Sequence, residues 1–281
     1  MIKVKPRVTF LGPLGTYSYR ASSEIFKDGF TEVPSSPFEE VFKTLENEQA
    51  DYAVIPIENN TAGIVDAALD LLIRSSLKIR GEYTLEIKHS LLSVEKNILK
   101  INKIYSLAQP YFQCQNYIQE RLSKAEWVQV SSSAHAIEMC KENPEASVAI
   151  GYADTGIEMG LNVMSENIQD LSNNETRFII LSKKEDNLPT SLSRSENIKT
   201  SLVFTLADEP GKLLEILNIF RNYSLNLCHI ESRPTRLKEW RYYFFLTVEC
   251  DKNQNMIKQA LEEIKSITPW FNNLGSYSLL L

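Results

Sequence analysis

The sequence has few residues of the kinds that bind metals, with four cysteines and three histidines in 281 residues. No Cys-x-x-Cys pair occurs, and no histidines stand at the spacing of metal ligands. A zinc knuckle and a dithiol redox motif are therefore excluded. We expect four buried free thiols, because cysteine is among the most buried residue types. The residues concerned are Cys114, Cys140, Cys228, Cys250, His89, His135 and His229.

The sequence also lacks a long apolar run, since nowhere do 18 or more apolar residues follow one another. The N-terminal stretch MIKVKPRVTFLG passes from lysines straight into a strand-like segment, without the apolar core and cleavage site of a secretory signal. We therefore predict a cytoplasmic chain with no membrane span.

Basic residues are fewer than acidic residues, with 30 lysines and arginines, 36 aspartates and glutamates, and a formal net charge of −6. A nucleic-acid partner usually requires a basic surface, so the composition argues against one and favours small-molecule ligands. The remaining composition, 43% hydrophobic and 23% charged, is typical of a globular protein. The length suggests about two domains.

From residue 7 to about 182, short β-rich segments alternate with helical patterns, which is typical of an α/β domain. Apolar residues between Ile64 and Ile73 predict a helix with a wide buried face. Further helices are expected near 18–27, 109–122 and 133–142. The expected strands are 7–11, 52–57, 83–94, 104–107, 127–131, 147–151 and 177–182.

The segment 183–199, KKEDNLPTSLSRSENIK, is polar, contains Pro189 and shows neither a helix nor a strand period, so we interpret it as a linker. Six elements follow, in the order βαββαβ of a ferredoxin-like unit. Pro210 and Asn222 fit the start and end of its first helix. The expected elements are strand 200–207, helix 211–222, strand 225–234, strand 240–250, helix 254–265 and strand 274–280.

Two polar clusters follow expected strands in the first part of the chain. In GPLGTYS at 12–18, glycines permit a tight turn and the amides of Thr16, Tyr17 and Ser18 can bind an anion, although on local grounds an ordinary turn is the favoured explanation. The cluster IPIENNTAG at 55–63 follows an apolar strand, where open α/β sheets bind ligands. On local grounds its Asn60 or Thr61 can equally be a helix cap.

Two further clusters have simple structural explanations when they are taken alone. In NNETRF at 173–178, strand alternation puts Thr176 and Phe178 on one face and Arg177 on the other, so Thr176 and Arg177 are poor candidates for contacting the same substrate atom. An ordinary strand start with an exposed arginine accounts for it. ESRP at 231–234 ends a strand at a proline, which is common.

The order and spacing of these motifs resemble the prephenate dehydratase family. The matching catalytic motifs are GPLGTYS, VIPIENNTAG with a following DLL at 70–72, NIQD at 167–170 and ETRF at 175–178. The motifs PGKLL at 210–214, LNLCHIESRP at 225–234 and LGSY at 274–277 are similar to those of the ACT regulatory domain fused to these enzymes. The resemblance spans essentially the whole chain.

The resemblance implies an α/β fold in which a two-lobed, periplasmic-binding-protein-like catalytic domain is followed by a βαββαβ ferredoxin-like ACT domain. The catalytic domain is expected over 1–183, with the active site between its lobes, a linker over 184–199 and the ACT domain over 200–281. The chain is expected to cross between lobes near 80 and 165. Lobe one then comprises about 1–80 plus 165–183, and lobe two comprises about 81–164.

The implied reaction is the decarboxylating dehydration of prephenate to phenylpyruvate, water and CO2, a carbon-oxygen lyase step of L-phenylalanine biosynthesis. L-phenylalanine is the implied feedback inhibitor of a homodimer or homotetramer, and no metal or organic cofactor is required. Arogenate as the substrate and a catalytically silent sensor stay open as alternatives. The sequence contains no segment resembling a chorismate mutase, so we expect a single reaction step.

The resemblance also implies roles for individual residues. Thr176 is expected to donate a hydrogen bond to the departing hydroxyl, and Phe178 is expected to form a wall of the cleft. Glu58 is expected to orient its loop or to lie near the hydroxyl end of the substrate, away from the carboxylates. The implied catalytic residues are Thr176, Glu58, Asn59, Ser106 and Gln113, and the implied substrate-binding residues are Gly15, Thr16, Asn60, Arg177 and Phe178. The implied effector site comprises Gly211, Lys212, Leu213, Asn226, Glu231, Ser232 and Arg233.

The chain departs from the family pattern in both halves. Where the family usually has Ser-His-Pro-Gln, this chain has SLAQ at 106–109, which changes a loop of the cleft. Ser132-Ser133-Ala134 replaces Ser-Thr-Ala and keeps the hydroxyl. In the ACT domain, Lys212 replaces an alanine and Cys228-His229 replaces Thr-Lys, which puts the range of amino-acid effectors in doubt.

Overall fold

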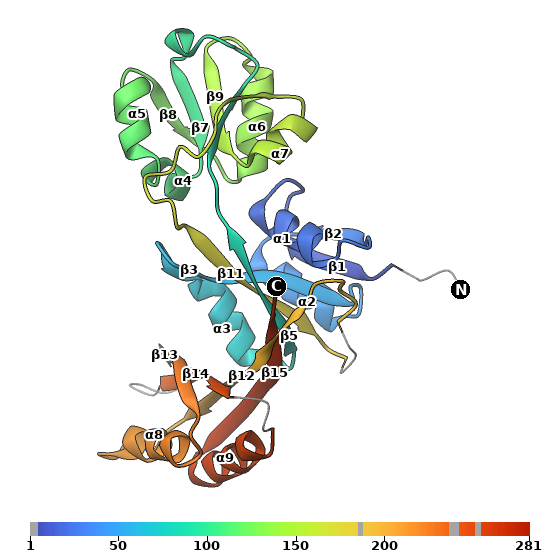
Figure 1. Cartoon of the computed structure of the whole chain (residues 1–281), viewed down its shortest axis with the longest axis vertical. Coiled ribbons are helices and arrows are strands. Elements are labelled where there is room, and N and C mark those ends of the chain that lie inside the picture. The colour runs from blue at the N-terminus through green and yellow to red at the C-terminus, as the bar shows by residue number, and fades with distance from the viewer. Residues whose placement is uncertain (1–4, 185–187, 236–241, 251–253) are drawn as a thin grey trace.

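The computed structural model of the chain describes residues 5–184, 188–235, 242–250 and 254–281. Two β-sheets follow each other along the long axis of the molecule, a five-stranded sheet at one end and a ten-stranded sheet that reaches the other end (Figure 1). Among the helices of the described residues, none has the length and apolarity needed to cross a membrane.

The first lobe holds one half of the ten-stranded sheet, in the order β5-β11-β3-β1-β2. Its central strand β3 is apolar almost throughout, and Ala53, Val54 and Ile55 are fully buried, because helices cover both faces of the sheet. The elements are β1 (Arg7–Leu11), α1 (Tyr17–Ile25), β2 (Thr31–Ser35), α2 (Phe38–Glu46), β3 (Tyr52–Asn59), β4 (Gly63–Ile64), α3 (Asp66–Arg74), β5 (Lys78–Glu86) and β11 (Glu175–Ser182).

The second lobe is built on the five-stranded sheet, in the order β10-β6-β9-β7-β8. All residues of its central strand β9 are buried, as expected for a strand covered on both faces. The elements are β6 (Ser90–Ser93), a 3-10 turn (Ile98–Lys100), β7 (Lys103–Ser106), α4 (Ala108–Phe112), α5 (Gln115–Arg121), β8 (Glu126–Gln129), α6 (Ser133–Glu142), β9 (Ser147–Gly151), α7 (Ala153–Glu158) and β10 (Asn162–Ser165).

The chain crosses between the lobes later than the sequence suggested. It leaves the first sheet after Glu86 and enters the second at Ser90, whereas the expected crossing lay near residue 80. The single strand expected over 83–94 is wrong, because β5 and β6 belong to different sheets and the apolar pattern simply continues across the gap. The return lies between β10 and β11.

The C-terminal unit has the predicted βαββαβ order, so the predicted fold class is confirmed. The predicted linker is partly wrong, since β12 begins at Arg194, within 184–199. That strand starts with exposed polar residues, which hid it in the sequence. The predicted domain limits otherwise stay a prediction. The elements are β12 (Arg194–Thr205), α8 (Lys212–Asn222), β13 (Asn226–Pro234), β14 (Tyr242–Cys250), α9 (Gln254–Ile267) and β15 (Trp270–Leu280).

The C-terminal unit continues the sheet of the first lobe. Strand β15 pairs in parallel with β5, with Leu279 opposite Glu82 and Leu280 opposite Tyr83, and Figure 1 shows β15 running from the C-terminal unit into the first lobe. One buried core cluster contains residues of both units, among them Ile79 of β5 and Tyr277 of β15. The two units are therefore joined by backbone pairing and by a shared core.

Several smaller expectations need correction. The helix expected over 109–122 is two helices, α4 and α5, and their junction at Gln113 places that side chain at the space between the lobes. Elements β2 and α2 were not expected. Pro34 lies in a terminal strand, where proline is tolerated, and Pro37 precedes α2. Helix α7 and strand β10 were also not expected.

The expectation of four buried thiols is wrong for Cys228. Cys114 and Cys140 are buried and Cys228 is exposed, and all three are free. The side chain of Cys250 lies outside the described residues. Burial raises the pKa of the Cys114 thiol to about 12, so this group is an inert core residue.

Candidate active site

A cleft of about 320 Å³ lies between the two lobes. The first lobe lines it with the carboxyl end of β3, the start of β11 and the turn before α1. The second lobe lines it with both ends of α4 and with the turn before α6. The polar lining residues are Thr16, Tyr17, Ser18, Asn59, His89, Gln109, Gln113, Ser131, Ser132, Ser133 and Thr176.

The Asn59 side chain is fixed by the backbone of the turn that follows it. Its Oδ1 accepts hydrogen bonds from the amides of Thr61 and Ala62, at 3.1 and 2.9 Å. Since Oδ1 is the acceptor, Nδ2 is the donor side of the amide, and it lies 2.9 Å from Thr176 Oγ1 and 2.8 Å from Asn174 Oδ1. The orientation of this side chain therefore follows from two main-chain N–H groups.

Thr176 lies opposite Asn59 in the β3–β11 ladder, and both side chains are mostly buried, with 9% and 6% exposed. Because the Thr176 hydroxyl oxygen accepts the hydrogen bond from Asn59, the hydroxyl hydrogen can point to a molecule in the cleft. The site thus contains one oriented hydroxyl donor on a rigid strand.

Gln113 connects the two lobes through three hydrogen bonds. Its Nε2 donates to Thr61 Oγ1 at 2.6 Å, and its Oε1 accepts from Asn174 Nδ2 at 3.1 Å. The same Oε1 lies 2.8 Å from Nε2 of His89. Since this oxygen can only accept, His89 Nε2 carries the hydrogen, and Nδ1 accepts from the Tyr17 hydroxyl at 2.8 Å.

His89 is held in its neutral form at the wall of the cleft. Only 1% of the residue is exposed, and burial lowers its pKa. Burial likewise raises the pKa of the Tyr17 phenol, so this group keeps its proton and can donate to His89. Both residues are neutral hydrogen-bonding groups near pH 7.

Two helices begin at the cleft from opposite lobes. Helix α1 begins after Thr16, whose Oγ1 accepts from the amide of Tyr19, and helix α6 begins after Ser132, whose Oγ accepts from the amide of His135. Both N-terminal residues line the cleft. The N-terminus of a helix favours anions, because its first amides and the helix dipole present positive charge there.

The described residues that line the cleft include no aspartate, glutamate, lysine or arginine. No group of three or more histidines, cysteines, aspartates or glutamates in the described part of the chain could hold a metal ion. The cleft can therefore bind an anion through neutral donors and helix ends, without a carboxylate that would repel it.

Five of the residues expected at the site line this cleft, and three others lie close to it. The buried Ser106 donates to the Leu107 carbonyl, Gly15 packs against Thr155, and the side chain of Asn60 bonds the backbone of 173–175. None of these three is a lining residue, so each supports the cleft from behind. The five lining residues are Thr16, Asn59, Gln113, Thr176 and Phe178.

Glu58 and Arg177 lie away from the cleft, on the opposite face of the same two strands. They pair with each other at 2.6 Å and line a cavity between the first lobe and the C-terminal unit. The geometry brings neither side chain to the cleft, so it does not support the contacts with substrate that were expected of Arg177 or the catalytic role expected of Glu58. The alternation of β11 accounts for this placement.

The expected effector residues fall into two groups. Gly211, Lys212 and Leu213 line a pocket of about 260 Å³ before α8. The others, Asn226, Glu231, Ser232 and Arg233, lie on β13 and are not among its lining residues. The guanidinium of Arg233 instead pairs with Asp66 and Asp70 of α3.

Sequence reasoning did not identify His89, Tyr17 or Asn174 as a connected set. His89 was hidden inside a segment read as one strand, and its partners Gln113 and Tyr17 are 24 and 72 positions away. The only available signal was a lone histidine next to a lobe crossing. Asn174 stood beside the recognised motif at 175–178 and could have been included with it.

The chain matches known families over most of its length. The model of the family described as prephenate dehydratase matches residues 8–186, and that of the ACT domain matches residues 200–267. The chain is similar to the bifunctional chorismate mutase/prephenate dehydratase of Aquifex aeolicus, with 34% identity over 276 residues, 98% of this chain and 74% of that protein.

Two solved structures resemble the chain along nearly its whole length. One is a prephenate dehydratase from Arthrobacter aurescens in complex with L-Phe, with a TM-score of 0.85, 31% identity, and coverage of 96% of this chain and 89% of that one. The other is GqqA, described as a novel type of quorum quenching acylase, with a TM-score of 0.85, 25% identity, and coverage of 97% and 98%.

Proposed function

This chain belongs to the prephenate dehydratase family, and on that premise we propose that it converts prephenate to phenylpyruvate, water and CO2 in L-phenylalanine biosynthesis. We also propose that L-phenylalanine inhibits this carbon-oxygen lyase through the C-terminal ACT domain. The proposal covers the dehydratase step alone.

One observation carries the proposal: the Thr176 hydroxyl is oriented by Asn59 inside a cleft whose lining is neutral. One ring carbon of prephenate carries a carboxylate and a pyruvyl side chain, which holds the second carboxylate. The opposite ring carbon carries a hydroxyl. A site for it must hold two anions at one end and offer a hydrogen-bond donor at the other. The neutral cleft meets both needs without a like-charge penalty.

The starts of α1 and α6 are the proposed sites for the two carboxylates. They face the cleft from opposite lobes, so each carboxylate can be held by the first amides of a different helix. The hydroxyls of Thr16 and Ser132 already serve as caps, which leaves the amides of Tyr17 and Ser133 as the proposed contacts. Binding the substrate this way also draws the two lobes together.

The chemical step needs little more than an oriented donor. The bond between the ring and its carboxylate breaks and its electron pair enters the ring, while the opposite carbon–oxygen bond breaks and the departing hydroxide takes a proton from solvent to become water. An aromatic ring results. Thr176 is a weak acid, so its role is to stabilise the departing oxygen by a hydrogen bond, an effect of roughly 10²–10⁴ in rate for a well-placed donor.

The remaining residues shape the cleft around this donor. Phe178, which is 1% exposed, closes the cleft next to Thr176 and keeps water from the ring. Gln113 fixes the second lobe against the turn after Asn59. We propose supporting roles for Gly15, Ser106 and Asn60, which hold the backbone that carries these groups.

For the effector, the pocket formed by Gly211, Lys212 and Leu213 is the proposed binding site of phenylalanine. Tyr242 and Phe244 line the same pocket and offer aromatic surface to the ligand ring. Lys212 is paired with Glu215 at 3.1 Å, and its ammonium is close enough to the pocket to attract a carboxylate. The range of amino acids accepted depends on this lysine.

A homodimer or homotetramer is part of the proposal. In the described sheet β13 is the terminal strand, so its outer edge can pair with a second copy. Asn226, Glu231 and Ser232 lie on this strand, and a second copy could bring them to an effector pocket. A cytoplasmic location is also proposed, in keeping with the free thiols of Cys114 and Cys140.

The direct test is to supply the purified chain with prephenate and measure phenylpyruvate. A parallel reaction with arogenate, measured as phenylalanine formed, decides between the two substrates. We expect phenylpyruvate from prephenate, at a rate that falls when phenylalanine is added. A chain that binds prephenate but forms neither product is a sensor, and the proposed function is then wrong.

A second candidate function rests on one contact at the rim of the cleft. Ser131 Oγ lies 3.1 Å from Nδ1 of His135. Acyl transfer requires a nucleophile and its base to lie within hydrogen-bond distance, and these two atoms do. This contact is relevant to function because the chain is similar to GqqA, which is described as an acylase. Hydrolysis of an acyl amide by the wild-type chain, lost in Ser131→Ala while phenylpyruvate formation persists, would support it.

A further inference from the structure

A buried carboxylate lies at the junction of the first lobe and the C-terminal unit. Glu82 of β5 is 3% exposed and stands where β5 pairs with β15. Its Oε1 is 2.7 Å from Nζ of Lys199 and 3.3 Å from Nε of Arg177. A charge at this depth is stable only when it is paired, and here one partner comes from each unit.

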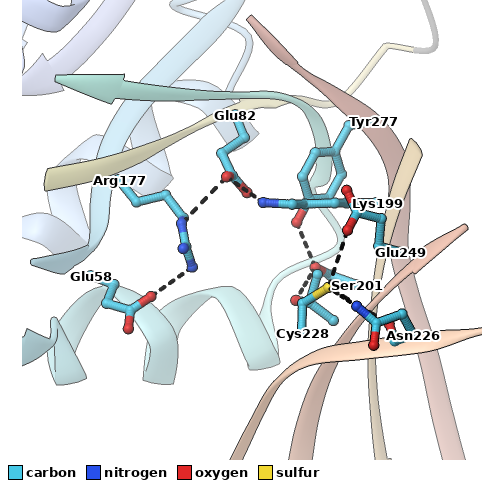
Figure 2. A network of polar contacts seen from close by, with 10 residues as sticks. Glu58, Glu82, Arg177, Lys199, Ser201, Asn226, Cys228, Glu249 and Tyr277 are labelled. Atoms are coloured by element: carbon cyan, nitrogen blue, oxygen red, sulfur yellow. Dashed lines mark hydrogen bonds and ion pairs between the residues drawn. The ribbon is translucent and has the colours of Figure 1, made fainter. Parts of the chain in front are cut away.

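The pairs form one row of alternating charge, shown in Figure 2. Lys199 of β12 contacts Glu82, Glu82 contacts Arg177, and Arg177 contacts Glu58 at 2.6 Å. The row therefore contains two acidic and two basic side chains. Three of them come from strands of the first lobe and one comes from a strand of the C-terminal unit. The cavity that they line measures about 40 Å³, which is room for water and not for a metabolite.

The inner end of this row lies directly behind the cleft. Arg177 follows Thr176 on β11, and Glu58 precedes Asn59 on β3. In the ladder Thr176 is opposite Asn59 and Arg177 is opposite Glu58. The two strands thus carry a neutral pair on the cleft face and an ion pair on the other face, one residue apart. A shift of the ion pair along the strands must shift the neutral pair as well.

We propose that Glu82 is a positioning residue that couples the C-terminal unit to the Asn59–Thr176 pair, holding Arg177 on one side and Lys199 on the other. The proposal rests on the proposed function, since it explains how an effector bound by the C-terminal unit reaches the reaction. Glu82 and Lys199 touch no residue of the cleft lining in the described contacts, so they act through Arg177.

The physical basis is the cost of leaving Glu82 with one partner. If β12 moves relative to β5, Lys199 is withdrawn and the buried carboxylate keeps Arg177 as its remaining cation. Arg177 is then drawn from Glu58 toward Glu82, and the register of β3 and β11 changes at the bulge between Arg177 and Phe178. An element with two such arrangements can transmit an equilibrium between sites.

A second contact joins the same two units on the neighbouring helix. Arg233 of β13 pairs with Asp66, the first residue of α3, and with Asp70 one turn later; this helix begins a few residues after the turn that holds Asn59. This contact is more exposed, since 71% of the Asp66 side chain is accessible. It adds a tie between the units and leaves the buried row as the stronger one.

The test uses Lys199, which belongs to the C-terminal unit and lies outside both proposed binding sites. Lys199→Met removes the charge and keeps the apolar stem, and Lys199→Arg keeps the charge. Lys183→Met is the matched control, because Lys183 pairs with Glu48 at 2.8 Å within the first lobe. Each protein is assayed with prephenate against increasing phenylalanine, and phenylalanine binding is measured by calorimetry.

Because Lys199→Met withdraws this cation permanently, it is expected to have a lower rate than the wild type without phenylalanine. Added phenylalanine is expected to lower that rate by a factor at least about fivefold smaller than in the wild type, the lower range of allosteric coupling. Phenylalanine still binds to it. Lys199→Arg and Lys183→Met are inhibited like the wild type. A wild-type rate of Lys199→Met without phenylalanine, its inhibition to the wild-type extent, or loss of all phenylalanine binding overturns the inference.

Hydrogen exchange separates this inference from the proposed function, because it needs no prephenate. Phenylalanine is expected to change the exchange of the β11 amides of the wild type and of Lys199→Arg, and to leave those of Lys199→Met unchanged. An equal response in Lys199→Met, or none in the wild type, contradicts the coupling. A failed dehydratase would appear instead as a wild-type chain that forms no phenylpyruvate.

Discussion

Strands β3 and β11 present two polar surfaces of opposite character. On the cleft face, Asn59 and Thr176 belong to a network of amides, hydroxyls and a neutral histidine. On the other face, Glu58 and Arg177 belong to a row of charges that continues to Glu82. Neighbouring residues of the same strands therefore work in two different electrostatic settings.

This difference follows from what each face must do. A cleft that receives a dianion gains from neutral donors, because a fixed carboxylate would repel the ligand and a fixed cation would hold it in the ground state. A junction between two units gains from charges, because a buried pair is costly to break and so ties the positions of the two units to each other. Substitutions on either face test this contrast, and the largest effect is expected on the cleft face.

The largest effect is expected at the hydroxyl of the cleft face. Thr176→Ala should lower kcat for prephenate by roughly 10²–10⁴, because it removes the donor to the departing oxygen. Its melting temperature should stay close to that of the wild type, since only a small group is lost. Steady-state kinetics and thermal unfolding check the two parts, and wild-type turnover would remove Thr176 from the mechanism.

A smaller effect is expected at the residue that orients this hydroxyl. Asn59→Ala removes one hydrogen bond to Thr176 and frees the turn at Thr61. Loss of a hydrogen bond of this kind should lower kcat/KM by roughly tenfold to a hundredfold. Asn60→Ala is the comparison, since Asn60 bonds the backbone of 173–175 and not Thr176 itself, so a smaller loss is expected, and an equal loss in both variants would argue against a specific role for Asn59.

On the charged face, the expected effect is on stability. Glu82→Gln leaves Arg177 and Lys199 without their shared carboxylate and should lower the free energy of unfolding by about 2 kcal/mol. Asp51→Asn is the comparison, since Asp51 pairs with Arg7 at 3.0 Å but is 26% exposed. Urea unfolding should show a loss below about 1 kcal/mol for that variant. Equal losses would contradict the special burial of Glu82.

The smallest effect concerns the neutral histidine. Burial lowers the pKa of His89 in the folded chain below its unfolded value of about 6.5, so the unfolded chain binds more protons as the pH falls. The stability that this group contributes is present above about pH 6.5 and is lost as the pH falls toward the folded pKa.

His89→Gln should therefore show a shallower loss of melting temperature between about pH 7 and about pH 5. His229, whose pKa is also lowered by burial, is present in both proteins and cancels in the difference. Identical pH profiles for the two proteins would mean that His89 is not held neutral.

Local patterns predicted much of this contrast. Alternation alone placed Thr176 and Phe178 on one face of a strand and Arg177 on the other, and the structure has them so. The bounds of β1, β9 and α6 were predicted from local strand and helix patterns, because these elements carry their signals within their own residues.

The partners of these residues could not be predicted in the same way. Glu82 meets Lys199 across 117 positions, and nothing near either residue indicates the contact. Arg177 was assigned to the substrate by the family resemblance, whereas only the pairing of β15 with β5 reveals that its face is covered. Long-range sheet pairing therefore decided which expected site residues reach the cleft.

The most direct measurement compares two substitutions at position 176. Thr176→Ser keeps a hydroxyl and Thr176→Val keeps the shape of threonine without one. We predict that the serine variant retains most of the wild-type kcat on prephenate, while the valine variant loses roughly 10²–10⁴ of it. Equal turnover of the two variants would contradict the claim that a hydroxyl at this position acts on the substrate.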